Sequence, residues 1–371
     1  MARGERSPSE STSIVDQRTG ARLRQVTSAP GIHHHPFFFV PAYDDAMKRL
    51  VFISHRTGSP QIFAEERSTG ELVQLTDQPA IAEWSIYPSH DGRFVYYTAG
   101  AAGWRVDAES FEAELLIDFG GATMREEGMI GAAMGTTALS RCDRWWAVKF
   151  NDGDDACLTI VDTDTRDWEV VLRRDTITHM QFCPDDPNLL FYAGPLTDRV
   201  WLVNRDGANN SRLYERQPQE WITHESWVPG TKELAIVEWP NAVRCLNPDT
   251  CKERRIAAFN AWHPVSNRQG TMMVADTNFP DIGIQLFDPR DGATGERWTL
   301  CYPEASSVGA HWDGPFPYAD GPIEVYAPQH THPHPSFSPD GTRVVYTSDR
   351  TGTAQIYEVQ LPAHLIQEMG A

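Results

Sequence analysis

Residues Leu50–Asp77 have the sequence LVFISHRTGSPQIFAEERSTGELVQLTD. The stretch contains three short segments rich in β-branched, aromatic and leucine residues, separated by the glycine-containing turns TG at 57–58 and STG at 68–70. Turns of this kind join antiparallel strands. The stretch therefore predicts a small antiparallel β-meander that can serve as one unit of a repeat.

Related units recur along the whole chain. The clearest second copy is Arg343–Gln360, RVVYTSDRTGTAQIYEVQ, in which SDRTGTAQIY parallels SHRTGSPQIF of the first. Weaker copies begin near five further positions: Phe94, Trp145, Leu189, Glu233 and Thr271. Seven units at an average interval of about 49 residues are typical of a seven-bladed β-propeller, an all-β fold. A β-sandwich array or two separate β domains are the alternatives.

The two ends of the chain indicate how such a ring closes. The last unit stops after its third strand, Gln355–Val359, whereas Ser13–Thr27, SIVDQRTGARLRQVT, has the turn and the outer-strand pattern that this unit lacks. Pairing the two would remove an open sheet edge. We therefore expect an N-terminal strand to complete the last blade. Residues 1–12 are predicted as a disordered tail, residues 13–371 as a single β-propeller domain, and Ala363–Gly370 as a possible helix.

Composition and charge argue against several classes of function. The chain has 371 residues and a formal net charge of −19, which disfavours nucleic acid or an anionic membrane as partner. No run of about eighteen apolar residues predicts a membrane-spanning helix, and the polar N-terminus lacks the apolar core of a secretory signal. Six cysteines without a CxxC pair fit reduced thiols. We therefore expect a cytoplasmic protein.

Histidine is the residue type that points to chemistry. One cluster is Gln329–Pro335, QHTHPHP, and alternate residues of an extended segment face the same side. His332 and His334 can therefore offer two imidazoles to one metal ion, with the amide oxygen of Gln329 as a candidate third ligand. Such a donor set, without thiolate, suits Zn, Mn, Fe or Ni. The alternative is a proline-rich turn with solvated histidines.

Two further histidines occupy the corresponding place in their own repeat units. His224 precedes the strand near Glu233, and His263 precedes the strand near Thr271. In a propeller this place is the loop that enters the innermost strand, so histidines from separate blades can converge on one face. Arg199 lies in the unit before His224 and can bind a carboxylate with its guanidinium fork. Structural histidines and a surface arginine are the alternatives.

The motifs around these residues resemble those of the oligogalacturonate lyases, the seven-bladed propeller enzymes of polysaccharide lyase family 22. Residues 329–340, QHTHPHPSFSPD, resemble the family pattern Q-x-T-H-P-H-P-S-F-x-P-D. HESW at 224–227 resembles H-E-x-W, and His263 with SN at 266–267 resembles H-x-x-S-N. DRVWLVNRDG at 198–207 resembles the R-x-W-x-(I/V)-N-x-D-G strand of the family. The resemblance covers nearly the whole chain.

This resemblance implies a function and roles for individual residues. The implied reaction is metal-dependent cleavage of short α-1,4-linked oligogalacturonides by β-elimination. A divalent metal, Mn²⁺ by analogy with the family, would be held by four residues: His263, Gln329, His332 and His334. His224 would be the general base that abstracts the C5 proton, and Arg199 would neutralise the uronate carboxylate.

The sequence departs from the family pattern at three places. FYAGP at 191–195 replaces a C-H-E-G-P stretch, the region around His311 follows H-x-x-S-W only in part, and a triple histidine replaces a single one near the N-terminus. The identity of the uronide and the oligomeric state therefore stay open, as do the roles of five histidines: His33, His34, His35, His179 and His311. The alternatives are a propeller lyase or glycoside hydrolase that acts on another glycan, and a non-catalytic TolB-like binding propeller.

Overall fold

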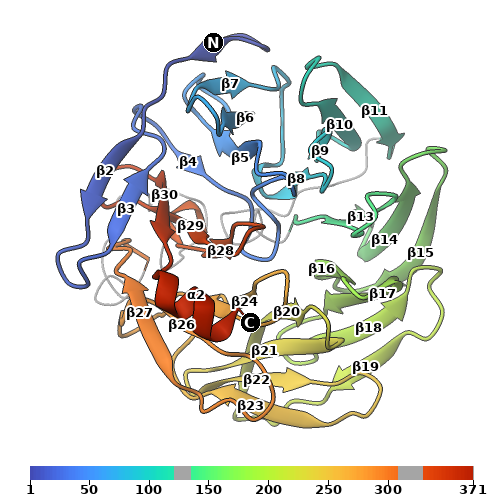
Figure 1. Ribbon diagram of the computed structural model, residues 1–371. Helices are drawn as coiled ribbons and strands as arrows, with labels where there is room; N and C mark the ends of the chain where they lie inside the picture. The colour runs from blue at the N-terminus through green and yellow to red at the C-terminus, as the bar shows by residue number, and fades with distance from the viewer. Residues whose placement is uncertain (121–134, 308–328, 371) are drawn as a thin grey trace.

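The computed structural model describes residues 1–120, 135–307 and 329–370. Within these ranges the strands form seven antiparallel sheets arranged in a ring (Figure 1). In each blade a strand that precedes the predicted repeat unit lies nearest the centre, and the strands of the unit follow towards the rim (Figure 1). The predicted seven-bladed β-propeller is confirmed.

The first four blades follow the chain in order. Blade 1 contains β4 (His33–His34), β5 (Arg49–Ser54), β6 (Gln61–Glu66) and β7 (Leu72–Gln74). Blade 2 contains β8 (Tyr87–Pro88), β9 (Phe94–Ala99), β10 (Ala102–Asp107) and β11 (Ala113–Asp118). Blade 3 contains β12 (Ala138–Leu139), β13 (Trp145–Asp152), β14 (Asp155–Asp162) and β15 (Trp168–Arg174). Blade 4 contains β16 (Thr178–Cys183), β17 (Asp186–Ala193), β18 (Val200–Asn204) and β19 (Ser211–Tyr214).

The last three blades complete the ring. Blade 5 contains β20 (Trp221–Val228), β21 (Glu233–Trp239), β22 (Ala242–Leu246) and β23 (Glu253–Ala257). Blade 6 contains β24 (Val265–Ser266), β25 (Met273–Ala275), β26 (Ile284–Phe287) and β27 (Arg297–Cys301). Blade 7 contains β28 (Ser336–Phe337), β29 (Arg343–Ser348) and β30 (Gln355–Gln360), followed by β3 (Arg22–Gln25) and β2 (Thr12–Val15) from the N-terminus.

The ring closes through the N-terminal strand, as the sequence predicts. β3 pairs antiparallel with β30, so that Leu23 lies opposite Val359, and β2 adds a further strand at the rim. The helix α2 (Ala363–Met369) follows, and it buries Leu365 and Met369 in the apolar cluster that blades 6 and 7 share. Among the described residues, no helix is long and apolar enough to cross a membrane.

The first dozen residues differ from the expected disordered tail. β1 (Arg6–Ser7) pairs with β7, with Arg6 opposite Val73, and extends blade 1 by one strand at its rim. The guanidinium of Arg6 also lies 3.6 Å from the carboxylates of both Glu66 and Glu71. The short edge strand β7 offers free backbone groups to any segment that reaches it, a context that composition alone does not reveal.

Nearly continuous apolar runs form the second strands of most blades. In β13, WWAVKFND, five consecutive residues from Trp146 to Phe150 are buried, because neighbouring blades cover both faces of the sheet. Strands covered on both faces lose the alternation of apolar and polar residues that a half-exposed strand shows. The repeat is therefore visible in the turns more clearly than in the periodicity of the strands.

A buried group of charges ties blade 7 to blade 1 where the ring closes. Glu358 on β30 and Glu65 on β6 are almost inaccessible to solvent, and Arg24 and Arg67 bridge the two carboxylates. Tyr43 donates its hydroxyl to Glu358 over 2.6 Å. Burial on its own would raise the pKa of Glu358, but Arg67, Tyr43 and Arg24 outweigh it and lower that pKa. Glu358 is therefore ionised, and its charge is matched inside the fold.

Substitution Glu358→Gln is expected to destabilise the propeller by about 3 kcal/mol, the lower end of the range for breaking a buried ion pair, since Arg24 is partly exposed. The measurement is the midpoint of urea unfolding followed by tryptophan fluorescence. The matched control is Glu71→Gln at the exposed pair with Arg6, where a change below about 1 kcal/mol is expected. Equal midpoints for the two variants would contradict this role of Glu358.

Candidate metal centre and active site

Histidines from four blades meet at one end of the central region of the ring. His179 lies on β16 and His224 on β20, while His263 precedes β24 and His332 and His334 precede β28. Their ring centroids are close: 4.3 Å from His224 to His263, 4.2 Å from His263 to His334, and 5.5 Å from His332 to His334. The predicted convergence of histidines from separate blades is therefore present in the structure.

Local backbone irregularities turn three of these side chains towards one another. His179, His224 and His334 have φ angles of 48°, 46° and 46°, in the left-handed region that non-glycine residues rarely adopt. The register of the innermost strands breaks around the first two, between Thr178 and Gln181 and between Thr223 and Ser226. A β-bulge changes the direction in which a side chain points. Backbone strain of this type is common at functional sites.

The structure corrects one detail of the prediction for His224. The strand near Glu233 is β21, the second strand of blade 5, and His224 itself lies within the innermost strand, β20. The prediction took the strand near Glu233 as the innermost one, so the strand before it was interpreted as the entering loop. The position relative to the centre of the ring is nevertheless the expected one.

His263, His332 and His334 form a group suited to a metal ion. One nitrogen from each ring lies within 4.8 Å of the others. Asp276, fully buried, accepts a hydrogen bond from His263 Nδ1 over 2.8 Å, which leaves Nε2 of that ring as the donor to a metal. Burial, followed by the neighbouring imidazoles of His263 and His332, lowers the pKa of His334 well below its usual value, so its ring is neutral. Metal binding requires neutral imidazole.

A buried atom without a partner supports the fit of a metal to these residues. Nε2 of His334 is buried and has no hydrogen-bond partner among the described residues. A buried polar nitrogen left in this way costs free energy unless some further group satisfies it. A divalent cation held by three imidazoles would supply that group.

Gln329 lies close in the chain to the metal group and is the candidate for a fourth metal ligand. It begins the 3-10 helix η3 (Gln329–Thr331), and its backbone carbonyl accepts the N–H of His332 over 3.1 Å. That contact fixes Gln329 one turn before the metal group. The participation of its amide oxygen in metal binding stays a prediction.

His224 lies beside the metal group rather than within it. Its ring is half-buried and lies 4.6 Å from Trp262 between centroids, and Nδ1 is buried without a partner among the described residues. Burial, then the nearby His263 and Arg199, lowers its pKa well below the usual value. His224 is therefore uncharged at neutral pH and able to accept a proton.

Arg199 is held in place by two neighbours. It directly precedes β18 and is almost fully buried, with Nε 2.6 Å from Oε1 of Glu225 and Nη2 3.2 Å from Oε2. The same Nη2 donates to Nδ1 of His179 over 3.1 Å. Nη1 has no hydrogen-bond partner among the described residues, so one edge of the guanidinium can still meet a ligand oxygen. Because Glu225 balances the charge, Arg199 acts there as an oriented donor more than as an isolated cation.

The triple histidine and the phenylalanines after it fill the centre of the ring. Phe37 contacts the rings of His179, His263 and His334, at centroid distances of 5.2, 6.1 and 4.7 Å. His35 is fully buried and its Nε2 donates to the carbonyl of His334 over 2.7 Å, which supports the strained backbone at that residue. His311 lies outside the described residues.

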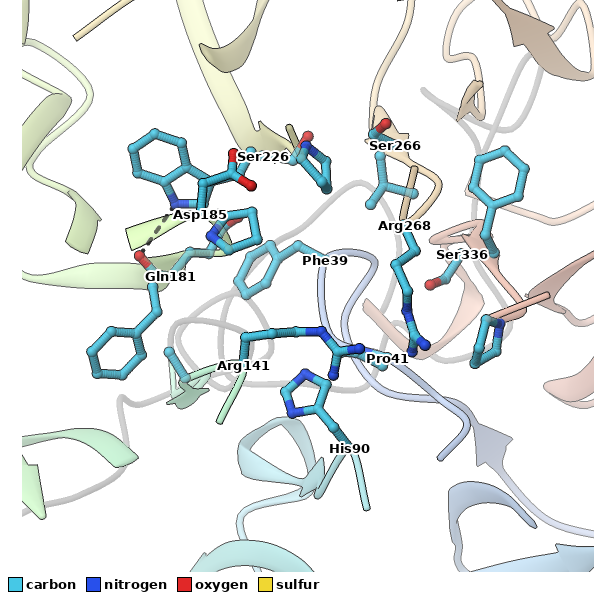
Figure 2. A pocket seen from close by; sticks show the side chains of 18 of the residues that line it. Phe39, Pro41, His90, Arg141, Gln181, Asp185, Ser226, Ser266, Arg268 and Ser336 are labelled. Atoms are coloured by element: carbon cyan, nitrogen blue, oxygen red, sulfur yellow. Dashed lines mark hydrogen bonds between the residues drawn. The ribbon is translucent and has the colours of Figure 1, made fainter. Parts of the chain in front are cut away.

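A separate cavity of about 440 Å³ opens at the other end of the central region. Its lining residues, among them Gln181, Ser226 and Ser336, follow the site histidines along the innermost strands. Phe39 is one of its lining residues, and the side chains of Arg141 and Arg268 extend towards each other close to His90 (Figure 2). The phenylalanines at 37–39 lie between this cavity and the histidine group. The volume of the cavity therefore gives no reason to place the chemistry there.

Comparison with known families decides the classification. The family model described as oligogalacturonate lyase matches residues 1–365. The chain belongs to this family. Members of the oligogalacturonate lyase family are carbon–oxygen lyases, and the chain is therefore an enzyme of that class.

Curated relatives and solved structures agree with the oligogalacturonate lyase assignment. An oligogalacturonate lyase of Dickeya dadantii (strain 3937) is 25% identical over 98% of this chain and 99% of its own length. An oligogalacturonide lyase of Pectobacterium atrosepticum is 24% identical over the same shares. The structure of an oligogalacturonate lyase in complex with manganese superposes with a TM-score of 0.83, at 22% identity, over 98% of this chain and 100% of that one. At that identity the superposition establishes the shared fold.

Three partners of the site were not found from the sequence. Asp276 follows His263 by 13 residues and Glu225 adjoins His224, but neither spacing indicates which ring or guanidinium the carboxylate meets. A signal for His179 did exist, because THMQF at 178–182 parallels THESW at 223–227. An alignment of the innermost strands of the repeat would have placed His179 beside His224.

Proposed function

We propose that this oligogalacturonate lyase family member cleaves short α-1,4-linked oligogalacturonides by metal-dependent β-elimination. The observation that carries the proposal is the group of facing imidazoles from separate blades, with His263 oriented by Asp276 and a guanidinium edge of Arg199 nearby. The relative whose structure was solved with manganese has the same fold, and Mn²⁺ is the metal we propose here.

The proposed ligands are His263, His332 and His334, with the amide oxygen of Gln329 as the fourth. The chemistry supplied by a bound divalent ion is Lewis-acid neutralisation of the uronate carboxylate. Arg199 orients the same carboxylate with its Nη1 edge, held in position by Glu225 and His179. These groups lower the free energy of the negative charge that develops when C5 loses its proton.

His224 is the proposed general base. Its neutral imidazole accepts the C5 proton, the electron pair of the C5–H bond forms the C4=C5 double bond, and the C4–O bond breaks with its pair on the leaving oxygen, which takes a proton from water. The products are one shortened oligosaccharide and one 4,5-unsaturated uronide. A cytoplasmic location, where imported di- and trisaccharides would be processed, stays a prediction.

The direct test is ultraviolet absorbance, since the new C4=C5 bond is conjugated with the carboxylate. Incubation with digalacturonate and trigalacturonate is expected to give a rising absorbance that EDTA abolishes and added Mn²⁺ restores. A flat trace with Mn²⁺ still bound would redirect the proposal to another uronate-containing glycan. Absence of Mn²⁺ binding together with a flat trace would overturn it.

A further inference from the structure

A second group of potential metal ligands lies outside the proposed active site. His34 is on β4 and His55 directly follows β5, both in blade 1, while Glu83 begins η1 (Glu83–Ser85), which leads into blade 2. Nε2 of His34 and Nε2 of His55 lie 3.1 and 2.8 Å from the same carboxylate oxygen, Oε2 of Glu83. Two imidazoles and one carboxylate therefore converge on a single point from three separate segments.

The hydrogen bonds of His34 make this arrangement unusual. Its Nδ1 lies 3.0 Å from the carbonyl oxygen of His35, which can only accept, so Nδ1 must carry a proton. In the neutral ring Nε2 then has a lone pair, and that lone pair faces a carboxylate oxygen. The contact is repulsive unless something positive lies between the two atoms. That positive group is either a second proton on a fully buried imidazole or a cation shared with Glu83.

The donor set matches a known class of metal site. Two imidazoles with one carboxylate are ligands of tetrahedral Zn²⁺, which usually leaves its fourth position to water or substrate. A tetrahedral ion with bonds of 2.0–2.1 Å separates its ligand atoms by about 3.3 Å, so the observed contacts need to widen by only a few tenths of an ångström. The hydrogen bond from His34 Nδ1 to a backbone carbonyl is the outer contact that metal-bound histidines typically make.

The surrounding packing separates this second group of ligands from the metal group of the proposed active site. Trp84 stacks on His34 with centroids 4.1 Å apart, and its ring lies 5.3 Å from His334. The backbone N–H of His55 donates to the carbonyl of Ile32 over 2.9 Å, which holds the turn after β5 against β4. An indole ring therefore stands between the two groups, and each can be occupied independently.

We propose that His34, His55 and Glu83 form a second divalent-cation site, of the zinc type, beside the proposed active site. This site does not depend on the proposed reaction. The competing explanation is a purely protein-made cluster in which a protonated His34 is paired with Glu83.

The test is the stoichiometry of Zn²⁺ binding to the full chain. After removal of metal with a chelator, Zn²⁺ is titrated calorimetrically and counted by mass spectrometry of the dialysed protein. Zn²⁺ binds nitrogen and oxygen ligands more tightly than Mn²⁺, so it reports both groups. Two equivalents are expected for the unchanged chain and one for His55→Ala, while Glu83→Gln should weaken one of the two sites at least tenfold.

The control is His90→Ala, which removes another histidine–carboxylate pair, with Asp143, and should leave two equivalents. Circular dichroism verifies that each variant is folded. The unchanged chain could instead bind a single equivalent of Zn²⁺. If that equivalent is lost in His332→Ala but kept in both His55→Ala and Glu83→Gln, the second site is overturned and the proposed function is left intact. One equivalent lost only in His55→Ala and Glu83→Gln would support the second site and remove the metal from the proposed function.

Discussion

His224→Ala is expected to lower kcat on oligogalacturonides by about 10²–10⁴-fold while Mn²⁺ binding is retained. The reason is geometric. His224 lies against His263 at 4.3 Å between ring centroids, but it is not among the three histidines whose donor atoms face one another. Its loss should therefore remove the proton acceptor without opening the metal group. The measurement is initial rate by ultraviolet absorbance, together with a calorimetric Mn²⁺ titration.

Two controls separate a base from a structural histidine. His364→Ala on the exposed face of α2 should have the activity of the unchanged enzyme, because that side chain is exposed and is not one of the site histidines. Added imidazole should partly restore turnover in His224→Ala, since a small base can enter the space left by the ring, and a merely structural role would not respond in this way. Ordinary activity in His224→Ala would show the base assignment to be wrong.

The fold was predictable because its signals are local and repeated. The turn sequences SHRTGSPQIF and SDRTGTAQIY mark blades 1 and 7, and the missing outer strand of the last unit identifies Ser13–Thr27 as its completion. Each signal lies within a few residues of the strand that it predicts. β1 was not predicted, because its partner β7 is more than sixty residues away and a strand of two residues is too short to show a periodic pattern.

The site was predictable only in part, for the same physical reason. QHTHPHP places two imidazoles within three residues, so spacing alone suggested His332 and His334 as ligands. The contact from Asp276 to His263 depends on the pairing of the segment before β24 with the residues after β25, and the His34–His55–Glu83 group depends on the packing of three segments. Such contacts are fixed by tertiary structure, and sequence separation does not encode them.

The other large effect is expected at the metal group itself. His332→Ala removes one of the three facing imidazoles and should abolish both Mn²⁺ binding at micromolar concentration and lyase activity. Asp276→Asn should be milder, because it weakens the hydrogen bond that orients His263 and leaves all three rings in place. A loss of 10–100-fold in Mn²⁺ affinity is expected for that variant.

The two variants are distinguished by their response to added metal. Excess Mn²⁺ should restore the activity of Asp276→Asn, with the activation curve shifted to higher concentration, whereas His332→Ala should stay inactive throughout. The measurement is initial rate against free Mn²⁺, alongside direct titration of the metal. If His332→Ala bound Mn²⁺ with unchanged affinity, the ion would have to lie elsewhere. The buried Nε2 of the neutral His334 ring would then need another binding partner.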